Sequence, residues 1–160
     1  ARRLCESGCG FITVSSPGWD MHGAHEFAIT DGMPVLGPAV DKAVSAFIED
    51  IESRGLSEKV LLVITGEFGR TPKINAKGGR DHWGNLCPLV FVGGGLKMGQ
   101  VIGESDKKGA EPITNPITSN DLLGTIMHSL FDLGQVRTLA NIPRDVQDVV
   151  GSGNPISELI

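Results

Sequence analysis

Apolar residues follow two different spacings along the chain. Two uninterrupted apolar runs, at residues 59–65 (KVLLVIT) and 87–95 (CPLVFVGGG), are typical of strands covered on both faces. Residues 38–54 and 120–133 instead repeat apolar side chains every three or four positions, which predicts two amphipathic helices. A shorter β-type run, FITVS at residues 11–15, follows a glycine turn.

The ends of the helices carry recognisable signals. Pro38 suits the first turn of the first helix, and Gly55 suits the C′ position just beyond its end. Ser119 or Asn120 is expected as the N-cap of the second helix. Residues 100–102 form one more candidate strand, and the C-terminal stretch is expected to be a weak helix and a loose tail.

The order of these elements predicts an α/β fold with a mainly parallel sheet and helices on both faces. Two polar loops, at residues 16–34 and 66–85, each follow a predicted strand. In parallel sheets, ligands bind beyond the carboxyl ends of the strands. We therefore expect both loops to lie at one edge of the sheet.

Composition and charge are those of an ordinary globular domain. Hydrophobic residues make up 40% of the 160 positions and charged residues 21%, which suits a single domain with a core. The net charge of −5 and the scattered lysines and arginines argue against a nucleic-acid partner, which favours a basic face. No apolar stretch reaches the roughly 18 residues that a membrane span needs.

The cysteines and the N-terminus add two expectations. The three cysteines, Cys5, Cys9 and Cys87, form no C-x-x-C motif, which argues against a thiolate zinc site and a dense disulfide framework. A Cys5–Cys9 bridge stays open as an alternative. The chain opens in what reads as the last turn of a helix ending at Gly8, as expected for a fragment of a longer protein.

The first polar loop carries candidate metal ligands. Asp20 and His22 are two positions apart, so in an extended segment both side chains point to the same side and can reach one ion. His25 needs a turn at Gly23 to join them. A polar surface loop that caps the next element is the alternative interpretation.

The second loop carries the complementary set. Glu67 follows a buried run and a Thr-Gly pair, which favours a position in the same crevice, although an N-cap or a partner of Arg70 is the alternative. His82 is a candidate ligand with Asp81 as its supporting carboxylate, and the reverse assignment is open. Imidazole and carboxylate together favour a divalent metal, zinc or manganese first, with calcium or magnesium as alternatives.

Two arginines complete the candidate chemistry. Arg70 and Arg80 carry planar guanidinium groups that suit phosphate or sulfate oxygens, and together with Asp81 they are the candidate catalytic residues. Structural salt bridges to Glu67 or Asp81 are the alternative. His128 falls outside both loops, on a helix face expected to be solvated.

Several motifs resemble a known family. GWDMHG, VITGEFGRTPKIN, GGRDHWGN, VFVGGG and ITSNDLLGTIMHSL are similar to the domain of unknown function 1501, over nearly the whole chain. The likeness falls on the carboxyl-terminal part of that family, which is often labelled sulfatase-like and itself resembles the alkaline phosphatase superfamily. The resemblance implies an α/β fold, hydrolysis of phosphate or sulfate esters at one or two divalent metals, and a periplasmic location.

The superfamily pattern also implies where this sequence departs from it. A Thr-x-Asp-His-Gly segment resembles residues 65–69, with Glu67 in place of Asp and Phe68 in place of a ligand His. The Asp-x-x-x-His metal motif resembles Asp20 with His22 or His25, at a different spacing. The last superfamily metal His resembles His82. The loss of a ligand at Phe68 argues against a complete two-metal site.

The resemblance places the superfamily nucleophile on an early strand, and no Ser, Thr or Cys of this chain has that context. Residues 1–160 are therefore expected to be one domain, the carboxyl-terminal fragment of a longer sulfatase-like protein whose amino-terminal part is a missing partner. Two functions follow as hypotheses. One is a metal-dependent hydrolase acting on phosphate or sulfate esters, and the other is a catalytically degenerate metal-binding or assembly module with the same fold.

Overall fold

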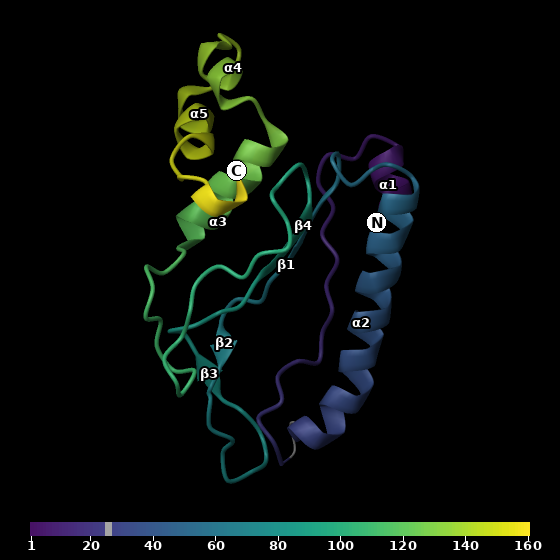
Figure 1. Cartoon of the computed structure of the whole chain (residues 1–160), viewed down its shortest axis with the longest axis vertical. Helices are drawn as coiled ribbons and strands as arrows, with labels where there is room; N and C mark the ends of the chain where they lie inside the picture. Colours follow the sequence, from purple (N-terminus) through teal and green to yellow (C-terminus); the bar gives the residue numbers. More distant parts are fainter. Residues whose placement is uncertain (25–26) are drawn as a thin grey trace.

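The computed structural model describes residues 1–24 and 27–160 (Figure 1). Its helices and strands are α1 (Arg2–Glu6), α2 (Ile29–Ser53), β1 (Leu61–Ile64), β2 (Gly69–Arg70), β3 (His82–Trp83), β4 (Val90–Gly93), α3 (Ser119–Leu130), α4 (Leu133–Thr138), α5 (Arg144–Val150) and the 3-10 turn η1 (Ser157–Leu159). In Figure 1, α2 runs along one side of the molecule. The helices α3, α4 and α5 gather on the other side of the strands.

The strands form two antiparallel pairs. β1 pairs with β4, with Leu61 opposite Gly93 and Ile64 opposite Val90, and β2 pairs with β3. The two apolar runs are thus neighbouring strands that run in opposite directions. The prediction of a mainly parallel sheet with helices on both faces, of the alkaline-phosphatase and sulfatase type, is therefore wrong for the described residues.

The connection between β1 and β4 explains the antiparallel pairing. A parallel pair needs a crossover, usually a helix, to carry the chain back to its starting edge. Residues 65–89 contain no helix, and they fold back on themselves through β2 and β3 instead. The chain therefore runs out through β1 and β2 and returns through β3 and β4. The apolar runs reflect partial burial, since all four residues of β1 are half-buried.

Helix α2 begins earlier than the sequence predicts. The expected start at Pro38 is wrong, because the helix starts at Ile29 and holds Pro34 and Pro38 inside it. Tertiary contacts support this first part: the Ile29 amide donates to the Gly78 carbonyl (3.1 Å). Its end is as predicted, since Gly55 follows the C-cap residue in the left-handed conformation, at φ 65°.

Close packing at Gly32 ties the start of α2 to the first polar loop. A Cβ at Gly32 would lie 2.8 Å from the side chain of Met21, which is one of the few buried apolar side chains. Packing of α2 against Met21 therefore holds the neighbouring residues Asp20 and His22 in place.

Helix α3 covers Ser119–Leu130, close to the predicted range, but its N-cap is Thr118 and not Ser119 or Asn120. Thr118 and Asp121 form a reciprocal capping box, in which each side chain accepts a backbone N–H of the other residue. His128 is exposed, as expected, whereas Thr125, three positions earlier in the helix, is fully buried.

Two of the predicted strands are absent. Residues 11–15 and 100–102 join neither pair of strands, and Phe11 and Val14 are 76% and 75% exposed. All three cysteines are free, so the alternative of a Cys5–Cys9 bridge is not realised. Among the described residues, no helix combines the length and apolar character needed to cross a membrane.

The apolar core is small and the exposed surface is large. Leu96, Ile156 and Leu159 form a buried cluster, and Leu61 and Phe91 pack against it. The accessible surface is 11096 Å². A compact monomer of this mass exposes about 7,700 Å². The described fold therefore leaves much apolar side-chain area in contact with solvent.

Thr125 is expected to be important for stability because its buried hydroxyl joins α3 to the C-terminal segment. It donates to the Asp121 carbonyl (2.7 Å) and accepts from the Ile156 amide (2.9 Å). Thr125→Val keeps the shape but leaves that buried amide without a partner, which we expect to cost about 1–3 kcal/mol. Thermal denaturation measures the loss. An equal loss for Thr138→Val, an exposed control, would contradict this role.

Candidate metal centre

The short β2–β3 pair places two candidate residues side by side. Arg70 and His82 are directly opposite each other in this pair, so their side chains leave the same face. The pair is closely packed, because a Cβ at the neighbouring Gly69 would lie 1.8 Å from the Leu86 carbonyl oxygen. The position of His82 therefore follows from strand pairing, and not from a parallel sheet edge.

A second contact brings the first polar loop to the same place. Gly23 and Gly78 form an isolated antiparallel bridge, and the Arg80 amide donates to the Met21 carbonyl (2.9 Å). The backbones approach so closely that a Cβ at Gly79 would lie 2.0 Å from the carbonyl carbon of His22. Glycine is thus required for the two loops to meet.

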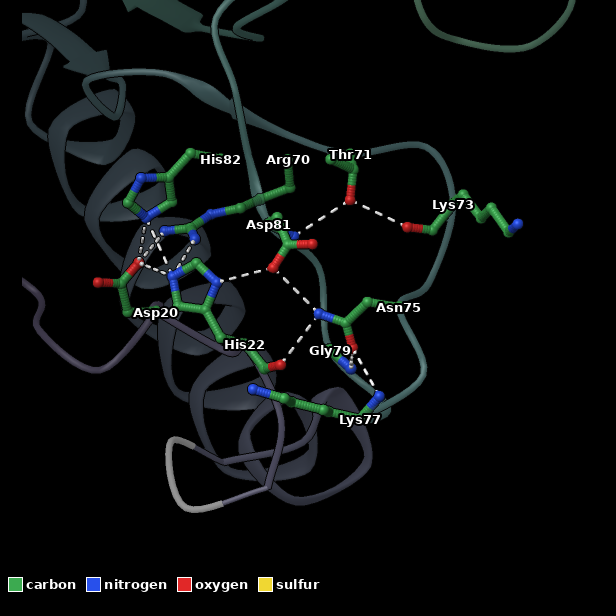
Figure 2. A network of polar contacts seen from close by, with 10 residues as sticks. All are labelled: Asp20, His22, Arg70, Thr71, Lys73, Asn75, Lys77, Gly79, Asp81 and His82. Atoms are coloured by element: carbon green, nitrogen blue, oxygen red, sulfur yellow. Dashed lines mark hydrogen bonds and ion pairs between the residues drawn. The ribbon is translucent and has the colours of Figure 1, made fainter.

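Asp20, His22 and His82 converge through one atom each (Figure 2). The Nε2 atoms of His22 and His82 are 3.0 Å apart. The Oδ1 atom of Asp20 lies 3.1 Å from Nε2 of His82 and 3.3 Å from Nε2 of His22. Asp20 and His22 come from a loop and His82 from β3, and the two histidines are 60 positions apart along the chain.

The triangle of these three atoms fits a small divalent cation. An ion about 2.1 Å from each atom, an ordinary distance for nitrogen and carboxylate ligands, would see angles of about 90–105° between them. Such a tripod covers one side of an ion and leaves the other side open. Two imidazoles and one carboxylate form a donor set that suits zinc, manganese or iron.

Asp81 sets the orientation of His22. The Nδ1 atom of His22 lies 3.3 Å from Oδ1 of Asp81, a carboxylate oxygen that accepts a hydrogen bond when the His22 proton is on Nδ1. With the proton on Nδ1, the lone pair of Nε2 faces His82 and Asp20. The sequence predicts Asp81 as the supporting carboxylate of His82, whereas the structure places Asp81 against the ring of His22.

Arg70 lies against the same three-atom group. Its Nη2 donates to Oδ1 of Asp20 (2.5 Å), and its Nη1 lies 3.4 Å from Nε2 of His22. The Arg70 guanidinium, and after it the hydrogen bond with His82, lower the pKa of Asp20 from 3.8 to about 2. Asp20 is therefore a carboxylate at any pH where the protein would function, and ready to bind a cation.

We predict that Arg70→Gln raises the pKa of Asp20 towards 3.8. Because the folded-state pKa is the lower one, ionised Asp20 stabilises the fold above about pH 4. That contribution is lost as the pH falls through about 2. NMR of the Asp20 carboxyl carbon in chelator-treated protein measures both values. An unchanged pKa in Arg70→Gln would show that Arg70 does not interact with the carboxylate.

The remaining predicted residues lie apart from this group. Glu67 is exposed and does not contribute an atom to it. Arg80 points its Nη1 at the carbonyl oxygens of Thr71 (2.6 Å) and Pro72 (2.5 Å), which supports the loop. His25 lies outside the described residues.

Phe68 forms a wall of the site. Its ring centroid is 4.2 Å from that of His82, and the Arg70 guanidinium carbon lies 5.6 Å from its centre. Phe68 therefore places an aromatic ring directly against a candidate ligand.

Two residues near the site have no counterpart in the sequence-based prediction. Asn75 donates to the His22 carbonyl and to Asp81, and Thr71 accepts from the Asp81 amide. An open hollow beside the three-atom group is lined by Asp20, His22, Asn75, Ala76, Lys77 and Asp81. The glycine pair at residues 78–79 signals a turn. The contacts that this turn and Asn75 make with the chain near residue 22 have no signal in the sequence.

Comparison with known families adds one finding. The family model described as protein of unknown function DUF1501 matches residues 1–160. The chain belongs to the DUF1501 family. No curated protein and no solved structure matches it. For this DUF1501 chain, the arrangement of Asp20, His22 and His82 is therefore the main guide to function.

Proposed function

We propose that this DUF1501 chain is a metal-dependent, hydrolase-type domain that acts on phosphate or sulfate esters. The observation that carries the proposal is the tripod of Asp20, His22 and His82, with atoms 3.0–3.3 Å apart and Arg70 against them. Two imidazoles and a carboxylate favour zinc or manganese, with calcium or magnesium as weaker candidates.

Each residue has a role in this proposal. Asp20, His22 and His82 hold the cation, which when bound would act as a Lewis acid on an ester oxygen. Asp81 orients His22, and Arg70 offers its remaining N–H groups to phosphate or sulfate oxygens on the open side. Arg80 supports the loop through the carbonyls it contacts, so we assign it no direct contact with the ester.

The described lining of the hollow beside the tripod offers a positive charge for an anionic ligand but no nucleophile. Lys77 lines it, and Figure 2 shows this side chain extending past the His22 backbone. The described lining residues carry no hydroxyl or thiol, so we propose that the nucleophile comes from outside residues 1–160. The amino-terminal part implied by the sulfatase-like resemblance is the proposed source, and the exposed apolar surface supports a covering partner.

A second function is a catalytically degenerate module that binds one cation and serves in assembly. Phe68, whose ring packs against His82, favours it, because the superfamily pattern that the sequence resembles has a ligand histidine at this position. Both proposals require the cation, so metal content does not separate them.

Turnover of an aryl phosphate and an aryl sulfate separates the two functions. Residues 1–160 alone are expected to bind one zinc or manganese ion, measured by calorimetry, without turnover. A longer polypeptide that also carries the amino-terminal part is expected to hydrolyse one of the two esters. Metal binding without turnover in the longer polypeptide supports the assembly module. Efficient turnover by residues 1–160 alone would contradict the external nucleophile.

A further inference from the structure

Asn75 lies where the two loops of the site meet, and its side chain is fully engaged. Its Nδ2 donates to the His22 carbonyl (3.1 Å) and to Oδ1 of Asp81 (3.0 Å). Its Oδ1 accepts from the amides of Lys77 (2.9 Å) and Gly79 (3.0 Å). One half-buried amide group therefore closes its own loop and also contacts both His22 and Asp81 (Figure 2).

The two donated hydrogen bonds act on the same histidine. The first holds the backbone of His22, and the second holds the Asp81 oxygen that lies 3.3 Å from Nδ1 of the His22 ring. Backbone and ring of His22 are thus both linked to one Nδ2 group. The Asp81 backbone is fixed separately, because its amide donates to the Thr71 hydroxyl (3.1 Å) and its carbonyl accepts from the Thr71 amide (2.9 Å).

We propose that Asn75 is a positioning residue for the cation site, acting through Asp81 on His22. The inference rests on the proposed function, because it assumes that Nε2 of His22 is a ligand. Without the Nδ2 donors, the Asp81 side chain can rotate away from His22, whose ring then loses its fixed direction and its single tautomer. A ligating histidine that loses its outer partner costs about 10–100-fold in metal affinity.

His82 provides a contrast within the site. Its ring packs against Phe68, and in the described residues its Nδ1 has no hydrogen-bond partner comparable to Asp81. Substitution of Asn75 should therefore change the ring orientation and tautomer of His22 but not those of His82. A general loosening of the loop would instead change both histidines.

The test compares three variants by two measurements. Asn75→Ala removes both roles of the side chain without changing charge. Asn75→Asp keeps the oxygen that accepts from Lys77 and Gly79 but loses the donors, so the loop can still close if the alanine variant fails to fold. Asn85→Ala is the matched control, because Asn85 also donates to a carboxylate, on Glu111 (2.6 Å), away from the three-atom group.

The first measurement is the affinity for zinc by calorimetry. Asn75→Ala is expected to bind about 10–100-fold more weakly than the unchanged protein, and Asn85→Ala equally well. The second is the ¹⁵N NMR signature of the histidine rings in chelator-treated protein. Both Asn75 variants are expected to lose the Nδ1–H signature of His22 and to keep the His82 signals.

The outcomes separate this inference from the proposed function. Absence of zinc binding by the unchanged protein would overturn the proposed function, while the NMR signature of His22 would still test Asn75. An unchanged His22 signature in both Asn75 variants would overturn the inference, whatever happens to the affinity. A shared change in His22 and His82 would also overturn it, because it would indicate a loosened loop.

Discussion

Replacing Asp20 with asparagine is expected to lower the affinity for zinc by about 100-fold or more, because the carboxylate is the negatively charged member of the three-atom group formed by the described residues. Loss of an outer partner of a ligand already costs about 10–100-fold, and loss of a ligand should cost at least as much. Asparagine keeps the size of the side chain, but its neutral oxygen cannot offset the positive charge of the cation. It also cannot offset the charge of Arg70, whose Nη2 lies 2.5 Å from Oδ1 of Asp20.

Thermal denaturation gives a second measure of the same effect. At a zinc concentration of 100 times the Kd, binding should stabilise the unchanged protein by about 2.7 kcal/mol, and the variant at that concentration by only about 0.4 kcal/mol. For a chain of this length, 2.7 kcal/mol corresponds to an increase in Tm of about 5–11 °C.

Glu67→Gln is the matched control for Asp20→Asn. Both substitutions remove one carboxylate from the predicted loops, but Glu67 is exposed and contributes no atom to the three-atom group. We expect zinc to raise the Tm of Glu67→Gln as much as that of the unchanged protein. A large loss with Glu67→Gln and none with Asp20→Asn would refute the tripod and favour a different ligand set.

Gly79→Ala is expected to have the largest effect on the fold around the site. A Cβ there would lie 2.0 Å from the carbonyl carbon of His22 and 2.4 Å from the amide of Gly23, and both are backbone atoms. Backbone cannot move aside as a flexible side chain can, so the two loops must separate. We expect a loss of about 3 kcal/mol or more, and a decrease in Tm of about 6–12 °C.

The loss at Gly79 should extend to the cation. Separation of the loops moves His22 away from His82, whose ligand atoms are only 3.0 Å apart, so zinc should no longer raise the Tm. Gly84→Ala is the control, since no atom lies within 4 Å of its Cβ position and its φ is not positive. That variant should be as stable as the unchanged protein, or more stable by up to about 1 kcal/mol. Equal effects of the two substitutions would contradict the role of close backbone contact.

The sequence predicts local features of this chain better than long-range ones. The end of α2 at Gly55 and the position of α3 follow from capping residues and apolar spacing, which act within a few residues. The start of α2 at Ile29 depends on Gly78 and Met21, which no local pattern reveals. Apolar runs predict the two strands that become β1 and β4, but they carry no information about the direction in which the strands pair.

The candidate site shows the same division. Residue type, spacing and loop position led to a ligand set that includes Asp20, His22 and His82, and the structure brings one atom of each of these three together, without Glu67. The expectation that a parallel sheet edge brings these residues together is wrong. The antiparallel β2–β3 pair and the contact between Gly23 and Gly78 bring them together instead. Asn75 escaped prediction because an asparagine before an Ala-Lys-Gly-Gly sequence is typical of an ordinary turn.

The large accessible surface of the folded chain also affects how it should respond to denaturants. The slope of the unfolding free energy against denaturant concentration, and the heat capacity of unfolding, both scale with the area that unfolding newly exposes. With 11096 Å² already in contact with water, less area is left to expose than in a compact protein of equal length. A shallow urea transition would thus be a property of this native architecture, and would not by itself indicate a folding intermediate.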